Sequence, residues 1–283
     1  MPLVSTAEII GAARAAGRGA GAFNVIGTEH AEAIVAGAEK AGSAVVLQIS
    51  ENCVAYHGAL APIGRAVLAA ADAATVPTAV HLDHATSADL IHEAVELGFG
   101  SVMYDGSALV YAENVRETAR IAAWCHNRGV FVEAELGEVG GKAGAHTAGA
   151  RTDPSEAADF VCATGVNFLA VAVGSSHAMV TRDAVLDLDL IRRIHAAVLV
   201  PLVLHGSSGV PDETLDAAIR AGLTKINIAT QLNKMFTSAV RGYLTGDSEV
   251  TDPRRYLAVG REAVAAEVAR LLGVLRADAG SRV

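Results

Sequence analysis

The sequence repeats one pattern eight times: an apolar run of four to eight residues is followed by a stretch with helical periodicity. The apolar runs, each expected to form a buried strand, occupy residues 21–25, 43–50, 77–84, 101–106, 130–136, 168–173, 200–204 and 225–228. Helices are expected near residues 28–41, 58–74, 112–127 and 188–197, and from Ser5, Ser87, Asp153, Gln231 and Pro253. Regular alternation of buried strands with helices is typical of a parallel sheet. We therefore expect an α/β fold, a (β/α)8 TIM barrel with an extra N-terminal helix and an extra C-terminal helix.

An open, doubly wound sheet is the alternative fold for the same pattern. Polar residues gather at the carboxyl ends of nearly all eight runs, which is where the active face of a barrel lies. This favours the closed barrel. A chain of 283 residues fits one such domain, spanning 1–283, and the sequence shows no linker or low-complexity tract.

Ionisable side chains close the run 77–84, which ends in His81, Asp83 and His84. Strand alternation is expected to send Leu82 and His84 to one face and His81 and Asp83 to the other. Packing alone does not explain three ionisable groups at the end of a buried strand. Asp83 is interpreted either as a proton-transfer group or as a carboxylate that orients a neighbouring histidine.

Two later runs also lead into a histidine. His177 follows the run 168–173 through a Gly-Ser-Ser turn, and His205 follows the run 200–204 directly. A single buried histidine is usually a hydrogen-bonded core residue. Imidazoles at three strand ends instead favour a zinc site with an open fourth position.

Composition limits the classes of function. With 52% hydrophobic residues the chain can bury a large core, yet no run is long and apolar enough to span a membrane. The N-terminal residues do not resemble a signal peptide, so a cytoplasmic location is expected. The three cysteines, Cys53, Cys125 and Cys162, are too scattered for a disulfide framework. A formal net charge of −9 argues against nucleic-acid binding but leaves room for a small anionic substrate.

Further polar groups are expected at the same end of the barrel. Glu133 and Glu135 lie on one face of the run 130–136, and one of them is a candidate metal ligand or support for a ligand. The glycine-rich segment 137–151 is long for a barrel connection and is interpreted as a mobile lid, with a merely flexible surface loop as the alternative. Gly-Ser turns and a threonine after the last three runs predict a phosphate site, because loops there commonly bind phosphate. These candidates are Ser175, Ser176, Ser207, Ser208 and Thr230.

Six ordered motifs together resemble the class II (zinc-dependent) ketose-bisphosphate aldolases, most closely the tagatose- and fructose-bisphosphate branch. The motifs are His81-Leu82-Asp83-His84, Glu133-Ala134-Glu135-Leu136-Gly137, Gly174-Ser175-Ser176-His177, Leu204-His205-Gly206-Ser207-Ser208-Gly209, Asn227-Ile228-Ala229-Thr230 and Asp252-Pro253-Arg254. The match stays in register from Ala22-Phe23-Asn24 to the last helix.

The resemblance implies a role for each matching residue. His84, His177 and His205 would hold the catalytic Zn²⁺, and Glu135 would serve an alternative metal position. Asp83 would shuttle the proton at the aldehyde oxygen, and Asn227 would contact the bound enediolate. The phosphate of dihydroxyacetone phosphate would be held by Gly206, Ser207, Ser208, Ala229 and Thr230, with a further contact from Ser50 and a monovalent cation nearby. Arg254 would take the far phosphate of a neighbouring subunit's substrate, in a homodimer or homotetramer.

Two positions depart from the family pattern. The family's lid carries a glutamate that removes the proton from the ketone's carbon, whereas no carboxylate lies between Gly140 and Arg151 here. His146 is the residue of that segment with an ordinary pKa near neutrality, so we hypothesise that it replaces the missing base. Its alternative is a solvated histidine without a role. Ala178 stands where the family usually has glycine.

Three functions fit these observations. The first is zinc-dependent, reversible cleavage of a ketose phosphate, such as fructose or tagatose 1,6-bisphosphate, to dihydroxyacetone phosphate and an aldehyde such as glyceraldehyde 3-phosphate. The second is a zinc hydrolase or isomerase on the same barrel, which would not need the phosphate turns. The third is a sugar-phosphate-binding relative that has lost its base. We favour the first, because it accounts for the histidines, the turns and Arg254 together.

Overall fold

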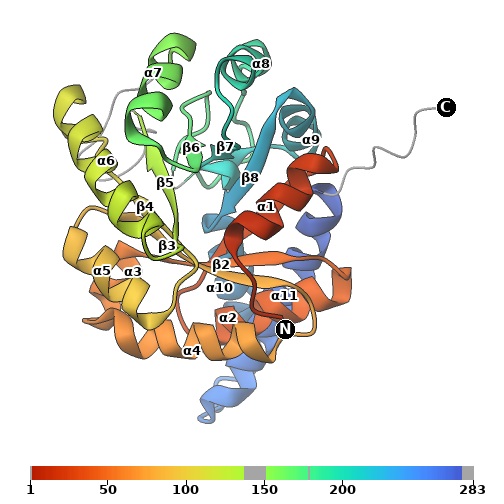
Figure 1. The fold of residues 1–283 in the computed structure, drawn as a ribbon. Coiled ribbons are helices and arrows are strands. Elements are labelled where there is room, and N and C mark those ends of the chain that lie inside the picture. Colours follow the sequence, from red (N-terminus) through yellow and green to blue (C-terminus); the bar gives the residue numbers. More distant parts are fainter. Residues whose placement is uncertain (1, 137–150, 178, 276–283) are drawn as a thin grey trace.

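The computed structural model describes residues 2–136, 151–177 and 179–275 (Figure 1). The strands are β1 (Ala20–Asn24), β2 (Val45–Ser50), β3 (Thr78–Ala85), β4 (Ser101–Tyr104), β5 (Phe131–Glu135), β6 (Phe168–Ala170), β7 (Leu202–Leu204) and β8 (Leu223–Ile228). The helices are α1 (Thr6–Ala15), α2 (Thr28–Ala41), α3 (Glu51–His57), α4 (Leu60–Ala73), α5 (Ala88–Leu97), α6 (Tyr111–His126), α7 (Pro154–Thr164), α8 (Leu188–Ala197), α9 (Asp212–Ala221), α10 (Thr230–Gly246) and α11 (Pro253–Leu275), with a 3-10 turn η1 (Ser207–Gly209).

The eight strands form a closed parallel barrel. Each strand pairs with the next along the chain, and β8 pairs with β1, so no edge remains open. The predicted (β/α)8 barrel is confirmed, with α1 as the extra N-terminal helix and α11 as the extra C-terminal one. All eight strands therefore direct their carboxyl ends to one end of the barrel, where the candidates His84, Glu135, His205 and Asn227 lie.

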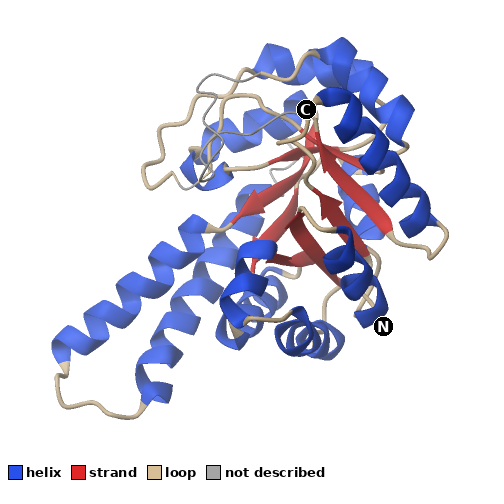
Figure 2. Cartoon of the chain, turned by 90° about the vertical axis from the view of Figure 1, so that its left-hand side faces the viewer, coloured by secondary structure: helices blue, strands red, loops and turns tan. Residues whose placement is uncertain are grey.

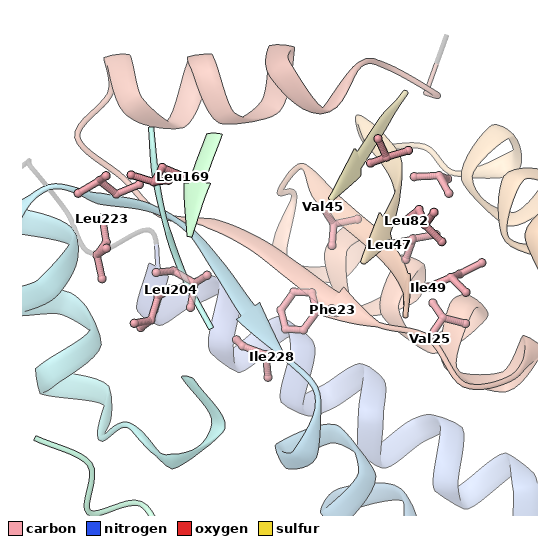
Figure 3. Packing of buried hydrophobic residues seen from close by; sticks show 14 of the residues in the cluster. Phe23, Val25, Val45, Leu47, Ile49, Leu82, Leu169, Leu204, Leu223 and Ile228 are labelled. Carbon is pink, nitrogen blue, oxygen red and sulfur yellow. The ribbon is translucent and has the colours of Figure 1, made fainter. Parts of the chain in front are cut away.

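Two apolar layers result from the alternation of side chains along the strands. Outward-facing residues such as Phe23, Leu47 and Leu204 pack against the surrounding helices (Figure 3). Inward-facing residues form a second cluster inside the barrel, which includes Ala22, Ala79 and Met103 as well as the α1 residues Ile9 and Ile10. Small alanines at several inward positions fit the narrow interior, and the α1 isoleucines complete this packing. Polar residues instead occupy the other end of the barrel, where the carboxyl ends of the strands lie.

Two helices lie where the sequence predicted none. Helix α3 begins after Ser50, whose Oγ accepts the backbone N–H of Cys53, and it ends at Gly58 in a left-handed conformation. Helix α9 follows Pro211 and ends at Gly222. Helix α3 has only 7 residues, too few for a clear apolar period. Helix α9 has 10 residues and buries Leu215, Ala218 and Ile219 at helical spacing, so its signal was present and was missed. Helix α4 accounts for most of the predicted helix 58–74.

Helices α10 and α11 form a hairpin that extends away from the barrel, visible at the lower edge of Figure 1 and at the lower left of Figure 2. Helix α11 packs against α2 along its C-terminal part, where Val264, Val268, Leu271 and Leu272 are buried. In α10, by contrast, Leu232 is the only buried residue.

No single helix among residues 2–136, 151–177 and 179–275 is long and apolar enough to cross a membrane. Helices α3 and α4 pass that test only when they are taken together, although the chain bends by 114° between them.

Candidate active site

Three histidines from three strands meet at the carboxyl end of the barrel. The ring centroids are 4.5 Å apart for His84 and His205, 5.1 Å for His84 and His177, and 5.6 Å for His177 and His205. One ring nitrogen from each lies within 4.8 Å of the other two. The structure thus brings together the three histidines that the sequence singled out, at a spacing that one metal ion can bridge.

His84 reaches this position through a local change of backbone conformation. Its φ of 54° places it in the left-handed region, which is uncommon for a residue other than glycine. The pairing of β3 with β4 shifts between Leu82 and Ala85 at the same point. The predicted alternation was therefore wrong for His84: it does not share the outward face of Leu82, because the irregular backbone turns it toward the other two histidines.

Hydrogen bonds indicate which nitrogen faces the centre in two of the three rings, His205 and His84. Nε2 of the buried His205 lies 2.9 Å from Oε1 of Glu133. A carboxylate only accepts, so His205 carries its proton on Nε2 and presents the lone pair of Nδ1. That Nδ1 is buried and has no hydrogen-bond partner in the described part of the chain. Nδ1 of His84 lies 2.9 Å from Oδ2 of Asp105, which orients its Nε2 in the same way.

These residues fit a zinc ion. Three imidazoles, two of them oriented by carboxylates, are the donor set of a catalytic zinc site that keeps a fourth position open. A second group, His84, Asp105 and Glu135, also has ligand atoms within 4.8 Å of one another. Asp105 was not singled out from the sequence. Its signal was available, since it directly follows β4 as His205 follows β7.

Asp83 points into the same end of the barrel and is surrounded by amide groups. Asn24 Nδ2 donates to Oδ2 of Asp83 at 2.9 Å, Gln48 Nε2 to the same oxygen at 3.5 Å, and Asn227 Nδ2 to Oδ1 at 3.4 Å. Burial raises the pKa of Asp83, but the neighbouring His84, His205 and Lys225 lower it more strongly. Asp83 is thus held as a carboxylate. Asn24 and Gln48 were missed, because a single amide at a strand end has no distinctive pattern.

The two glutamates of β5 share the inward face, as predicted, but have different surroundings. Glu133 is completely buried and accepts from Lys225 Nζ at 2.8 Å and from His205, while His81 lies 3.8 Å away. Burial raises the pKa of Glu133, but the positive Lys225 and the hydrogen bond from His205 lower it more strongly, so the net pKa lies below its usual range. Glu135 lies one layer higher, with Oε2 3.5 Å from His205 Nδ1. Glu133 therefore supports a histidine, and Glu135 is the candidate ligand.

A turn suited to phosphate lies beside the histidines. Gly206 has a φ of 67°, and a side chain there would collide with the backbone of Ser176. Ser208 Oγ accepts the backbone N–H of Gln231 at 3.1 Å, so the hydroxyl proton remains available for an anion. Ser207 is buried and its hydroxyl donates to the carbonyl of Asn227, which leaves its backbone N–H as its possible contribution.

The other predicted phosphate contacts lie nearby along the barrel rim. Ala229 and Thr230 form the start of α10, a helix of 17 residues whose N-terminus favours an anion. Ser50 ends β2 opposite Asp83 of β3, and its side chain caps α3. Ser175 donates to the carbonyl of His205 at 2.6 Å and is buried, so it joins two loops.

Arg254 is not brought to this site. It lies at the start of α11, where the hairpin is farthest from the barrel (Figure 2). Its side chain is 89% exposed and its guanidinium is paired with Asp252. The candidate base His146, as well as Glu138 and Ala178, lies outside the described residues.

Comparisons with known proteins agree with this geometry. The sequence profile of the family described as "Fructose-bisphosphate aldolase class-II" matches residues 4–279. A fructose-bisphosphate aldolase of Geobacillus stearothermophilus is 38% identical over 272 residues, covering 95% of each chain. One from Staphylococcus aureus is 37% identical over 268 residues, covering 93% of this chain and 94% of the relative.

Solved structures show the same relationship. The crystal structure of the YdjI aldolase from Escherichia coli K12 superposes with a TM-score of 0.86 at 30% identity, covering 99% of this chain and 100% of that one. A putative fructose-1,6-bisphosphate aldolase from Coccidioides immitis gives a TM-score of 0.85 at 29% identity, covering 95% of each chain. Matches to the sequence profile and to these relatives over nearly the whole length establish that the chain belongs to the class II fructose-bisphosphate aldolase family.

Proposed function

We propose that this protein binds one zinc ion through His84, His177 and His205 and cleaves a ketose bisphosphate reversibly to dihydroxyacetone phosphate and an aldehyde. The fructose and tagatose 1,6-bisphosphates are the proposed substrates, with glyceraldehyde 3-phosphate as the aldehyde. The observation that carries the proposal is the convergence of three ring nitrogens within 4.8 Å, beside the turn that holds Ser208. Zinc dependence is general to the family to which the chain belongs.

When bound, zinc supplies Lewis-acid chemistry, which polarises the ketone carbonyl of the substrate. Asp83, kept ionised by its surroundings, would accept the proton of the substrate hydroxyl whose oxygen becomes the aldehyde oxygen. In the condensation direction the same carboxyl returns that proton. Asn227 donates to Asp83 and lines the same space, so it helps to orient the reacting carbons.

The phosphate group of dihydroxyacetone phosphate is assigned to the turn after β7 and the start of α10. Ser208 would donate its hydroxyl proton, and the backbone N–H groups from Gly206 to Ser208 and at Ala229 and Thr230 would add further donors. Ser50 is a weaker candidate, because its oxygen already caps α3. A monovalent cation beside the phosphate is proposed from the resemblance alone. A cytoplasmic location is proposed as well.

His146 is proposed as the group that removes the proton from the ketone's carbon. It replaces the acidic residues that the family usually has in this segment, and a histidine is suited to proton transfer near neutral pH. A relative that acts on another ketose phosphate, or one that binds sugar phosphates without turnover, is the alternative if this base is not functional.

The proposal is tested by removing and restoring the metal. Chelation should abolish release of dihydroxyacetone phosphate from the bisphosphates in a coupled assay, and about one zinc per chain should restore it.

Site variants separate metal binding from proton transfer. His84→Ala, His177→Ala and His205→Ala should each lose most of the zinc. Asp83→Ala should keep its zinc but lower kcat by about two to four orders of magnitude. His146→Ala should slow exchange of the dihydroxyacetone phosphate proton with solvent more than it weakens binding.

The matched control is Arg192→Met, which alters an exposed ion pair on α8 and should change neither zinc content nor turnover. Full activity of the metal-free protein would refute the zinc assignment. Zinc binding without turnover of any ketose phosphate would support the alternative of a binding protein.

A further inference from the structure

The loop that carries His177 and the turn that carries Ser208 are packed directly against each other. Ser175 Oγ donates to the carbonyl of His205 at 2.6 Å, and the Ala184 N–H donates to the carbonyl of Gly209 at 3.0 Å. Side chains at Gly206 and Gly209 would collide with Ser176 and Met179, respectively. The absence of a Cβ at both glycines is what allows this close approach, so neither segment can shift without moving the other.

Arg182 is the charged residue that ties the two segments together. Its Nε and Nη2 donate to the carbonyl of Val210 at 3.1 and 2.6 Å, and Nη2 also donates to Asp212. Val210 directly follows η1 and is completely buried, while Asp212 begins α9. One planar guanidinium thus joins the β6–α8 loop to the end of the phosphate turn.

The same guanidinium starts a chain of alternating charges that returns to Ser208. Asp212 also accepts from Arg270 of α11, which donates to Glu267 at 2.8 and 2.9 Å. Glu267 accepts from the side chain of Gln231 at 3.0 Å, and the backbone N–H of Gln231 is bonded to Ser208 Oγ.

The carboxylates of Asp212 and Glu267 both stay ionised in this series of contacts. Burial raises the pKa of Asp212 and of Glu267, but hydrogen bonds from the arginines lower it more. A second link runs in parallel, since Lys234 Nζ of α10 donates to the carbonyl of Val180 at 2.7 Å. The position of Ser208 is therefore linked to the His177 loop both through the packed glycines and through side-chain charges.

We propose that Arg182 is a positioning residue that couples phosphate binding to metal binding. The inference rests on the proposed function, which assigns the metal to His177 and the phosphate to Ser208. A phosphate held by the turn fixes the turn, and Arg182 passes that restraint to the loop that carries His177. Ordering that loop in advance lowers the free-energy cost of assembling the metal site. By thermodynamic linkage, bound metal strengthens phosphate binding by the same factor.

The test measures zinc affinity by competition with a chromogenic chelator, without and with saturating methyl phosphate. This probe has a phosphate group but no carbonyl, so it does not reproduce the substrate's ketone. In the wild-type protein, methyl phosphate should tighten zinc binding about tenfold, within the usual range of coupling between sites. Arg182→Met should reduce this factor severalfold, with the remainder carried by the packed glycines and Lys234. Arg182→Lys should give an intermediate factor, because an ammonium cannot reproduce the forked contact.

Arg192→Met serves as the control, because it removes an exposed arginine from α8, the helix that follows this loop, and it should keep the full factor. If Arg182→Met does not fold, Asp212→Asn removes the carboxylate that Arg182 shares with Arg270 and should also reduce the factor. A purely structural role would lower stability but leave the factor unchanged.

The possible failures are distinguishable. Wild-type protein that binds zinc and methyl phosphate independently, or Arg182→Met protein that keeps the tenfold factor, would overturn the coupling and leave the proposed function intact. Wild-type protein that binds no zinc would overturn the proposed function and the coupling with it.

Discussion

His81 lies in the closed interior of the barrel, one layer below the three histidines that meet at its mouth. Its side chain is completely buried, and its Nδ1 lies 2.7 Å from Ser101 Oγ, which in turn is bonded to Thr6 of α1. Burial lowers the pKa of His81 to about 3, and the nearby positive charge of Lys225 lowers it too, against a weaker opposite effect of Glu133. His81 is therefore neutral in the folded protein, unlike in the unfolded chain at mildly acidic pH.

This difference predicts how His81 affects stability as the pH changes. Between pH 6.5, the unperturbed value, and about 3, the unfolded chain binds a proton that the folded protein does not. The folded state should thus lose about 1.4 kcal/mol of stability for each pH unit of acidification in that window. In denaturant titrations of chelated protein, the stability difference between wild type and His81→Gln should shrink by this slope as the pH falls from 6 to 4. A pH-independent difference would contradict the assignment.

Residue types at strand ends were predictable from the sequence, whereas their exact surroundings were not. His205 was located because an apolar run stops at it, His177 because it follows another run after a short turn, and Glu135 because it lies near the end of the run 130–136. The left-handed backbone of His84 was not predictable, because it depends on the shifted pairing of β3 with β4. Nor was the pairing of Glu133 with Lys225, since these residues are far apart in the sequence and meet only when the barrel closes.

At the level of elements, the close packing of α2 on α11 depends on a glycine. A Cβ at Gly37 would lie 2.6 Å from the carbonyl oxygen of Ala265 and 2.7 Å from Cβ of Val268. Neither atom belongs to the far end of a flexible side chain, so the helices would have to separate. Gly11 of α1 provides the contrast, because a Cβ there would meet no atom within 4 Å.

The two glycines are therefore expected to respond oppositely to the same substitution. Alanine is favoured over glycine in a helix by about 1 kcal/mol, so Gly11→Ala should raise the free energy of unfolding by about that amount. Gly37→Ala gains the same preference, but overpacking costs about 1–3 kcal/mol, and the net effect should be a loss. Urea denaturation midpoints measure both. Stabilisation by Gly37→Ala would show that α2 and α11 can move apart freely.

Helix identity followed from the sequence for long helices such as α2 and for the ten-residue α8, whereas α3 and α9 were missed. The 7 residues of α3 form only about two turns, which is too few to distinguish a helix from a loop, but the pattern of α9 was readable in Leu215, Ala218 and Ile219. The sequence nevertheless contains signals for where these helices begin, namely Ser50 before α3 and Pro211 before α9.

At the level of the whole molecule, the α10–α11 hairpin is larger than the barrel alone requires. A surface groove on α10 is lined by the apolar side chains of Phe236, Val240 and Leu244, and Leu244 is 40% exposed. The tip of the hairpin carries Arg254, whose side chain is 89% exposed. These features support the proposal that the hairpin packs against a second copy of the chain, as a homodimer or within a homotetramer, and delivers Arg254 to that copy's substrate.

Mixing two defective variants tests this arrangement. Arg254→Ala should raise KM for a bisphosphate but hardly affect a ketose monophosphate, because only the contact with the remote phosphate is lost. Asp83→Ala should be inactive because the proton-transfer group is absent.

If Arg254 acts across a two-fold interface, half of the randomly reassembled dimers are hybrids, and each hybrid has one intact site out of two. The mixture should then recover about a quarter of wild-type activity at low substrate. Activity equal to the sum of the separate variants would show that Arg254 does not serve a neighbouring subunit. Mixing Asp83→Ala with His84→Ala is the control. Both residues belong to the same barrel, so each site of a hybrid keeps one defect, and the mixture should recover no activity beyond the sum of the separate variants.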